Sequence, residues 1–376
     1  MVSNSKEVAA EFPPLLRVYT DGTVERLVGS PYVPPTTDDP ATGVSSKDIS
    51  ISKDVSARLY LPKLTDSHLL KFPILVYFHG GGFCVESAFS FLHHRYINLL
   101  ASEAKVLAVS VEYRLAPEHL LPTAYEDSWA ALQWVSSLSV GDNINKEPWL
   151  INHGDFDRVF IGGDTAGANI AHNITMRAGI EHLPGKVKIL GTYLSQPFFW
   201  GSKPIGSESS MGHQQNMINR VWMFVYPSAQ GGIDNPMINP FAPGAPSLSG
   251  LGCSWLLVCV AEKDVAKDRG IHYCDAVRES GWEGEAELYE VEGGEHGFHI
   301  CNPETEIAEN MMKRLACFLS CSLRVEAFQC PNSFFIQVGH SCVADTVVTV
   351  WVVVVTEDCR RIKLQYCGFK LAFATR

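Results

Sequence analysis

Short apolar runs alternate with segments of helical spacing along most of the chain. Runs rich in β-branched and aromatic residues predict strands at residues 55–62, 74–78, 106–111, 159–161, 187–194, 255–260 and 285–291. Helical spacing predicts helices at residues 124–138, 266–280 and 304–319, and an Ala-rich helix after the glycine pair at 162–163. Continuous apolar strands separated by helices are typical of a parallel sheet that helices cover on both faces. The pattern therefore predicts an α/β fold.

The same pattern divides the chain into three parts. Residues 1–45 precede the first core strand, and residues 46–320 carry the α/β alternation. Within that domain, residues 198–249 break into Gly, Pro, Asn and aromatic residues, which indicates an insertion over the sheet rather than a separate domain. We expect the N-terminal segment and the insertion to form a lid.

Residues 321–376 differ in composition from the rest of the chain. They hold five of the eleven Cys and the run VVTVWVVVV at residues 347–355. This run is too short to span a bilayer, and its β-prone apolar character is unsuited to an exposed position. We interpret the segment as an atypical, foreign extension that is weakly ordered and prone to aggregate. An extra hairpin packed on the body is the alternative.

Composition and charge exclude several classes of protein. Hydrophobic residues make up 46% of the 376 residues, enough for a sizeable core, which excludes intrinsic disorder for most of the chain. The formal net charge of −11 differs from the basic surface of a nucleic-acid-binding protein. There is no run of 18 apolar residues, no apolar signal segment and no CxxC spacing. We expect an acidic cytoplasmic protein with reduced thiols that binds neither nucleic acid nor membrane.

The segment Gly163-Asp164-Thr165-Ala166-Gly167 lies between a predicted strand and a predicted helix. A nucleophile on so tight a turn needs residues without side chains two positions before and after it, and both positions hold Gly. The pattern alone occurs by chance in many chains, but its place between strand and helix makes it more specific. Thr165 is therefore the candidate nucleophile, where Ser is usual.

A second glycine-rich motif, His79-Gly80-Gly81-Gly82-Phe83, follows the predicted strand at 74–78. Consecutive glycines let backbone N–H groups converge on one point, as a developing oxyanion requires. No Gly-Lys-Ser/Thr follows, which excludes a nucleotide P-loop, and a plain glycine-rich turn is the alternative. We expect the N–H groups of Gly81, Gly82 and Ala166 to form an oxyanion hole.

An acid and a base follow the last two predicted strands. Asp264 and His296 both lie in loops at the carboxyl ends of strands, where open α/β sheets bind ligands. Nucleophile, acid and histidine in this order along the chain match the order of α/β-hydrolase triads. Asp268 and Asp275 are rival acids, and His299 is the rival base.

Taken together, the motifs resemble the plant carboxylesterase family of the α/β-hydrolase fold. The resemblance covers roughly residues 12–320 and is carried by HGGGF, YRLAPEH, AYEDSWAALQW, GDTAGAN and EHGF. RVYTDGTVERL, TGVSSKDI, FCVESAFSF and FFWGSKPIGSE are most similar to the 2-hydroxyisoflavanone dehydratases of that family, which also carry Thr at the nucleophile position. SPYVPP, LAPEHLLP and GDFDR resemble the related alkaloid cyclases equally. The resemblance therefore implies the fold and leaves the substrate open.

Three functions remain open. The preferred one is a carboxylic ester hydrolase acting on small aromatic or acyl esters, in which His296 deprotonates Thr165 and Asp264 orients the imidazole. The methyl group of Thr stiffens χ1 and should slow acyl transfer. The alternative is a dehydratase-type lyase, in which the oxyanion hole holds a ketone oxygen and His296 removes the neighbouring proton. A hormone receptor similar to the gibberellin receptors is less favoured, because those receptors lack the catalytic His.

The expected ligand is an aromatic small molecule. Phe, Trp and Met residues are frequent in the N-terminal segment, at residues 83–91 and at residues 198–222, although the same residues could belong to the core. Neither reaction requires a metal or redox cofactor. The sequence leaves the oligomeric state open.

Overall fold

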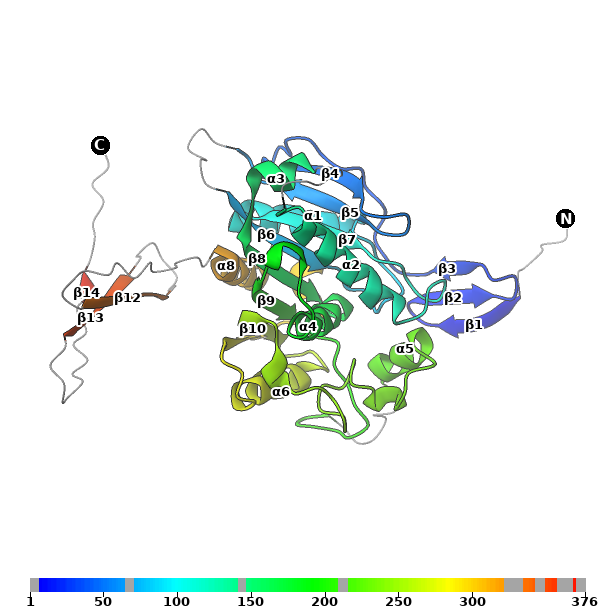
Figure 1. Cartoon of the computed structure of the whole chain (residues 1–376). Helices are drawn as coiled ribbons and strands as arrows, with labels where there is room; N and C mark the ends of the chain where they lie inside the picture. The colour runs from blue at the N-terminus through cyan, green and yellow to red at the C-terminus, as the bar shows by residue number, and fades with distance from the viewer. Residues whose placement is uncertain are drawn as a thin grey trace. The chain divides into compact units, whose positions relative to one another are not determined.

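The computed structural model describes residues 7–64, 71–140, 147–208, 216–320, 334–341, 349–356 and 368–369. Its centre is an eight-stranded sheet in the order β11-β10-β9-β8-β6-β7-β5-β4 (Figure 1). All neighbouring strands are parallel except β5, which pairs antiparallel with β4 and β7. The strands are β4 (Ser45–Ser50), β5 (Ser56–Leu61), β6 (Phe72–Phe78), β7 (Leu107–Glu112), β8 (Gly154–Asp164), β9 (Ile189–Ser195), β10 (Cys253–Ala261) and β11 (Glu285–Val291).

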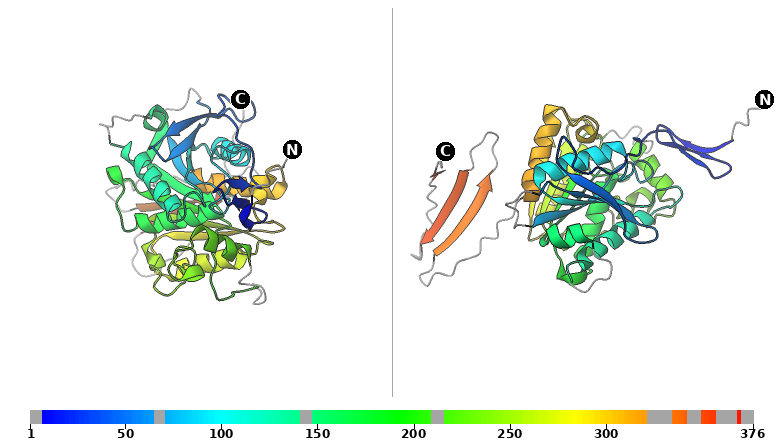
Figure 2. Two further views of the ribbon diagram at one scale, coloured as in Figure 1. Left: turned by 90° about the vertical axis from the view of Figure 1, so that its right-hand side faces the viewer. Right: turned by 90° about the horizontal axis from the view of Figure 1, so that it is seen from above.

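Helices cover both faces of this sheet. On one face α1 packs against α7, α8, β5 and β7, and on the other α4 packs against α2, β8 and β9, while α6 packs against β10 and β11. The view from above in Figure 2 shows α1 (cyan) and α8 (orange) together on one side. The helices are α1 (Phe91–Ala104), α2 (Thr123–Ser137), α3 (Pro148–His153), α4 (Ala166–Ala178), α5 (Met217–Val225), α6 (Lys267–Glu279), α7 (Phe298–Cys301) and α8 (Glu306–Ser320), with the short 3₁₀ helices η1 (Pro184–Lys186), η3 (Gly232–Asp234) and η4 (Leu248–Gly250).

The continuous apolar runs are the strands that lie between two layers of helices. Every residue of β6 is buried, because β7 and β8 flank it and helices cover both of its faces. The run at residues 159–161 is only part of β8, whose residues 155–158 are partly or fully exposed and whose residues 159–164 are buried. The predicted α/β fold is therefore confirmed, and the bounds of its strands differ from those of the apolar runs, most of all in β8.

The N-terminal segment forms a separate three-stranded antiparallel sheet, which the apolar pattern does not predict because its strands are short and mostly only partly buried. It lies beside α5 of the insertion (Figure 1), where the rings of Phe12 and Phe224 are 3.9 Å apart. Arg26 fastens the segment to the domain by an ion pair with Glu118 (2.8 Å) and a hydrogen bond to the carbonyl oxygen of Cys84 (2.8 Å). The N-terminal segment and the insertion therefore lie together. The strands are β1 (Val8–Phe12), β2 (Leu16–Tyr19) and β3 (Val24–Arg26).

Residues 321–376 form a second compact unit, separate from residues 1–320. In it β12 (Phe334–Ser341) pairs antiparallel with β13 (Thr349–Thr356), which also pairs with β14 (Gly368–Phe369). Most of the apolar run at residues 347–355 thus lies in β13. The interpretation of this unit as a foreign, weakly ordered extension concerns mainly residues outside the described ones and stays a prediction.

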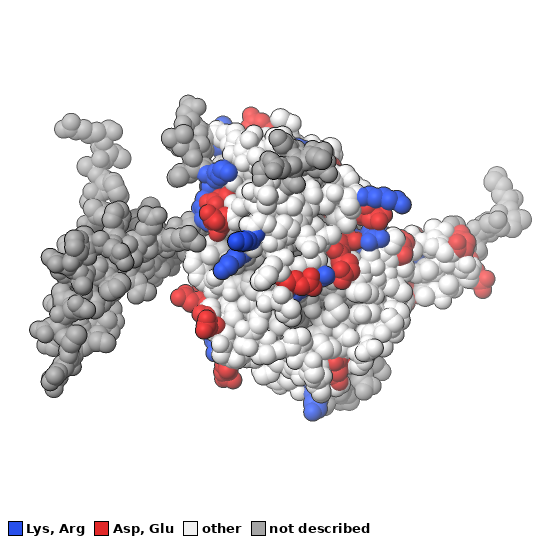
Figure 3. Space-filling view, in the orientation of Figure 1, with Lys and Arg blue, Asp and Glu red and all other residues white. Residues whose placement is uncertain are grey.

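Charged side chains of both signs are interspersed over the described residues on the face in Figure 3. Many of them pair, as Arg177 does with Glu126 (3.0 Å) and Glu181 (2.9 Å). No helix among the described residues is long and apolar enough to cross a membrane. The six cysteines in this part of the chain form no disulfide: Cys84, Cys253, Cys259, Cys274, Cys301 and Cys317.

Candidate active site

Thr165 occupies the sharp turn between β8 and α4. Its φ of 52° and ψ of −111° are a strained backbone conformation for a β-branched residue. Two hydrogen bonds hold the turn: the N–H of Thr165 donates to the carbonyl oxygen of Ser195 (2.9 Å), and the N–H of Phe198 donates to that of Thr165 (3.0 Å). The strained turn is the geometry that presents a nucleophile at the carboxyl edge of such a sheet.

The glycines of the motif allow a close backbone approach. A Cβ on Gly163 would lie 2.4 Å from the carbonyl carbon of Gly167 and 2.5 Å from the carbonyl oxygen of Phe78. A Cβ on Gly167 would lie 1.9 Å from the same oxygen. Neither position has room for a side chain, which is the physical reason for the spacing seen in the sequence.

The structure brings Thr165, His296 and Asp264 together from three different loops. Oγ1 of Thr165 lies 3.0 Å from Nε2 of His296, and Nδ1 of His296 lies 2.7 Å from Oδ2 of Asp264. Oδ1 of Asp264 accepts a hydrogen bond from the N–H of Ala266 (3.0 Å). With Nδ1 donating to the carboxylate, Nε2 of a neutral imidazole is left to accept the hydroxyl proton. The arrangement has the hydroxyl–imidazole–carboxylate order of a catalytic triad.

The surroundings of His296 keep it a usable base. Desolvation lowers the pKa of this imidazole, but the hydrogen bond to Asp264 and the negative charges of Asp264 and Asp164 outweigh it and raise the pKa above its ordinary value. The side chain of His296 is 46% exposed, whereas that of Asp264 is 2% exposed. The base therefore faces solvent or substrate, and its orienting carboxylate does not.

The rival residues have other surroundings. His299 is buried, its two ring nitrogens have no partner among the described residues, and burial lowers its pKa to about 3. Asp268 accepts hydrogen bonds from the N–H and the hydroxyl group (2.6 Å) of Ser207. Asp275 pairs with Arg278 at 3.0 Å. All three lie outside the hydrogen-bonded chain from the hydroxyl to the carboxylate.

The predicted oxyanion donors are free to bind a ligand. Among the described residues, the N–H groups of Gly81, Gly82 and Ala166 donate to no protein acceptor. Gly81 has φ 102° and Gly82 has φ 59°, conformations that glycine adopts at little cost. The N–H groups therefore come from two separate segments, the loop after β6 and the first residue of α4.

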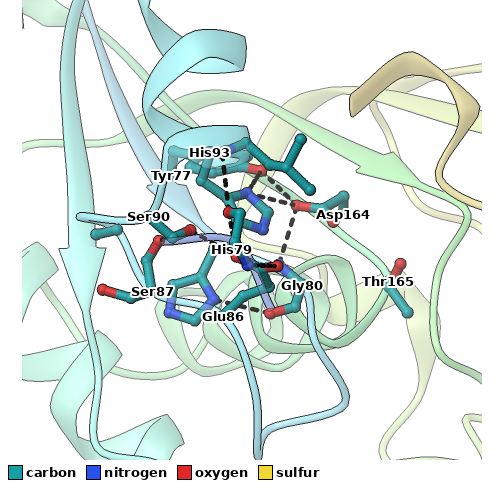
Figure 4. A network of polar contacts seen from close by, with 12 residues as sticks. Tyr77, His79, Gly80, Glu86, Ser87, Ser90, His93, Asp164 and Thr165 are labelled. Atoms are coloured by element: carbon teal, nitrogen blue, oxygen red, sulfur yellow. Dashed lines mark hydrogen bonds and ion pairs between the residues drawn. The ribbon is translucent and has the colours of Figure 1, made fainter. Parts of the chain in front are cut away.

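A buried polar network joins this loop to the nucleophile turn (Figure 4). Oδ1 of Asp164 accepts hydrogen bonds from the phenol of Tyr77 and from the N–H of Gly80 (3.0 Å), and Nδ1 of His93 lies 3.2 Å from the Tyr77 hydroxyl. Burial raises the pKa of Asp164, and its hydrogen bonds oppose that rise. The sequence does not predict the contacts of Tyr77 and His93. Its only sign of them is a single phenol in the apolar strand β6.

His79, the residue before these glycines, packs in the interior beside the same loop. Its ring stacks on that of Tyr113 with centroids 4.3 Å apart, and the Tyr113 hydroxyl donates to the carbonyl oxygen of His79 (2.7 Å). Complete burial lowers the pKa of His79 to about 3, so the ring is neutral. His79, Gly80 and Asp164 therefore shape the glycine loop, while none of them belongs to the triad.

Some aromatic residues considered for the ligand pocket belong to the core. The ring of Phe83 packs against those of Tyr125, Phe198 and Trp222, with centroids 5.8–6.4 Å apart. All four side chains are buried. This cluster is part of the hydrophobic core.

A cavity of about 540 Å³ lies where β5 begins and β7 ends. Glu86, Glu112, Tyr113 and Arg26 are among its lining residues, and no triad residue is. Within the described part of the chain, no three His, Cys, Asp or Glu side chains lie together as metal ligands. Independence from cofactors stays a prediction.

Known proteins are similar to this chain in sequence and in fold. A family model described as the α/β hydrolase fold matches residues 75–300. A 2-hydroxyisoflavanone dehydratase of Glycyrrhiza echinata is 60% identical over 84% of this chain and 98% of its own length. One from Glycine max is 56% identical over 84% of this chain and 99% of its own length. The structure is similar to that of a hyperthermophilic esterase of the archaeon Pyrobaculum calidifontis, with a TM-score of 0.60, 27% identity and coverage of 73% of this chain and 82% of that one.

Proposed function

Because this chain belongs to the α/β-hydrolase fold family and is an enzyme of its esterase-like branch, we propose that it eliminates water from a 2-hydroxylated isoflavanone. Two dehydratases of that substrate class, at 60% and 56% identity, support the proposal. The sequence motifs alone favour ester hydrolysis. The high sequence identity to these two dehydratases instead favours the elimination of water. The observation that carries the proposal is Thr165 in hydrogen-bond contact with the base of an otherwise complete triad.

The elimination needs a base, an oxyanion hole and a proton for the leaving group. The substrate has a ketone, an acidic C–H next to it, and a hydroxyl group on the following carbon. His296 removes the C–H proton, and the electron pair forms an enolate whose oxygen accepts hydrogen bonds from the N–H groups of Gly81, Gly82 and Ala166. The enolate then re-forms the ketone, expels the hydroxyl group and leaves a carbon–carbon double bond.

Thr165 supplies the hydrogen bond that the departing hydroxyl group needs. The imidazolium of His296 returns its proton, directly or through the hydroxyl of Thr165, and the leaving group departs as water. No covalent bond to the enzyme forms in this sequence, so a secondary alcohol at the turn is no disadvantage. Asp264 stabilises the imidazolium between the two proton transfers.

Carboxylic ester hydrolysis is the second candidate. The distances of 3.0 Å from Thr165 to His296 and 2.7 Å from His296 to Asp264 also suit acyl transfer. The structural similarity to an esterase supports this candidate. Crowding by the Thr methyl group would make the reaction slow. A receptor function is the least supported, because His296 is in place.

The test compares two substrates with one preparation of the protein. The purified full chain is incubated with 2-hydroxyisoflavanone, and isoflavone formation is followed against a blank without protein and against His296→Ala. p-Nitrophenyl acetate is assayed in parallel. We expect isoflavone formation well above the blank that depends on His296, with weaker ester turnover. Ester turnover without any dehydration would refute the proposal in favour of the hydrolase.

A further inference from the structure

Gln196 lies between the nucleophile turn and the loop of the catalytic base, and nothing described so far gives it a function. It follows β9 directly, is 2% exposed and has a φ of 49°, unusual for a residue with a side chain. Its N–H donates to the carbonyl oxygen of Cys259 in β10 (2.7 Å), which anchors its backbone to the sheet. A polar side chain buried in a strained conformation at this point requires an explanation.

The side-chain amide of Gln196 binds the two backbone groups that flank His296. Nε2 donates to the carbonyl oxygen of Glu295 (3.0 Å), and Oε1 accepts from the N–H of Gly297 (2.7 Å). The backbone group of Glu295 is an acceptor and that of Gly297 is a donor, so a single orientation of the amide binds both. The amide therefore closes a ring of hydrogen bonds around the backbone of His296.

The same short segment also holds the nucleophile. The residue before Gln196, Ser195, accepts the N–H of Thr165 at 2.9 Å. Thr165 and His296 are 131 positions apart in the chain, yet Ser195 binds the backbone N–H of Thr165, and Gln196 binds the backbone of the two residues next to His296. An error of about 1 Å in such a pair costs on the order of a hundredfold in rate, so a device that fixes the two loops relative to each other has a large effect on catalysis.

We propose that Gln196 is a positioning residue that sets the distance and orientation of the His296 imidazole relative to Thr165 and the substrate. The proposal rests on the proposed function only in that His296 is the base, and it holds for elimination and for ester hydrolysis alike. The side chain of Asp264 orients the imidazole ring through Nδ1. Gln196 does not contact the ring and acts on the backbone of the loop that carries it.

Two variants separate positioning from simple structural support. Gln196→Leu removes both hydrogen bonds at similar volume. Gln196→Glu keeps the acceptor for Gly297 but opposes a carboxylate to the carbonyl oxygen of Glu295, and it regains a donor only when it is protonated. Asn235→Leu is the matched control, because Asn235 is also buried, donates to the carbonyl oxygen of Gln230 (2.9 Å) and accepts from the N–H of Met237 (3.0 Å).

The experiment measures kcat, KM and Tm of the full chain and its variants on both substrates. For Gln196→Leu we expect kcat to fall roughly 10- to 100-fold while KM changes less than about threefold, as expected for a misplaced base. Asn235→Leu should lower Tm by a similar amount and keep kcat within about twofold. Wild-type kcat in Gln196→Leu, or an equal loss of kcat in Asn235→Leu, would overturn the proposal.

Gln196→Glu provides a second test of the proposal, which can be made even if Gln196→Leu does not fold. Its kcat relative to wild type should rise as the pH is lowered from 8 to 5.5, because protonation restores the donor; a constant ratio would overturn the proposal. The Nδ1 proton of His296 gives a readout that needs no substrate, since its low-field NMR resonance should shift or disappear in the Gln196 variants and persist in Asn235→Leu. Absence of turnover by the wild type on both substrates would refute the proposed function, while this resonance would still decide the role of Gln196.

Discussion

The phenol of Tyr77 donates a hydrogen bond to the buried carboxylate of Asp164, the residue directly before Thr165. The same carboxylate accepts the N–H of Gly80 at 3.0 Å. One buried carboxyl group thus ties the glycine loop of the proposed oxyanion hole to the nucleophile turn. Because this group is buried, each donor that it loses leaves a polar oxygen without a partner.

Tyr77→Phe should therefore destabilise the protein by about 1–3 kcal/mol and lower kcat, since Asp164, which also binds the N–H of Gly80 in the glycine loop, loses one of its two donors. Urea unfolding and kcat on either substrate measure the two effects. Tyr289→Phe, which removes a hydroxyl group from a partly exposed position on β11, is the control and should change neither quantity much. Equal stability of both variants would show that the hydrogen bond from the Tyr77 phenol to Asp164 does not stabilise the fold.

Gly167→Ala should be among the most damaging single changes in the chain. Its Cβ would lie 1.9 Å from the carbonyl oxygen of Phe78, and backbone atoms cannot make room as a flexible side chain could. We expect loss of activity with a Tm far below that of wild type, or no folded protein. Gly250→Ala, whose Cβ would meet nothing within 4 Å, should stay within about 0.5 kcal/mol of wild type. A stable, active Gly167→Ala would refute the account of the turn.

The sequence predicts that Thr165, Asp264 and His296 lie together, because this grouping depends on a few residues with strict backbone requirements. Gly163 and Gly167 are recognisable without a structure, since only glycine tolerates the contact with Phe78. The strands β6 and β7 are equally clear, because helices cover both of their faces and most of their residues are apolar. The positions of Asp264 and His296 follow from the rule that loops at the carboxyl ends of parallel strands meet.

What the sequence did not predict depends on tertiary contacts between single polar groups. Tyr77 looks like any aromatic residue of a buried strand until Asp164 is placed against it. Gln196 has no local signal, because its partners at Glu295 and Gly297 are about a hundred positions away along the chain. The three strands of the N-terminal segment have only three to five residues each, too few for a clear alternation of apolar and polar residues, and could not be recognised either.

Asp264→Asn should lower kcat by orders of magnitude, through loss of the group that orients His296 and stabilises its protonated form. Asp268→Asn should cost far less, because that carboxylate binds Ser207 and does not reach the imidazole. Both variants retain the shape of the side chain, so Tm serves as the check on folding. A larger loss of kcat in Asp268→Asn would contradict the assignment of the acid.

The pH dependence of kcat/KM should follow the ionisation of His296. The base must be neutral, and Asp264 and Asp164 raise its pKa above the ordinary value of 6.5. Activity should therefore fall with decreasing pH through a midpoint above pH 6.5. In the residual activity of Asp264→Asn that midpoint should move to lower pH, because the hydrogen bond and the charge that raise the pKa are lost. A midpoint that is unchanged in Asp264→Asn would mean that another group titrates.

The most direct test of the central claim, that the Thr165 site eliminates water without a covalent intermediate, is kcat/KM of wild type, Thr165→Ser and Thr165→Ala on 2-hydroxyisoflavanone and on p-nitrophenyl acetate. Thr165→Ser removes one methyl group and should raise ester turnover roughly tenfold if the relief of crowding amounts to about 1.4 kcal/mol, with dehydration unchanged or lower. Thr165→Ala should abolish ester turnover and retain part of the dehydration, which the base and the oxyanion hole sustain. Equal loss of both activities in Thr165→Ala would contradict the account.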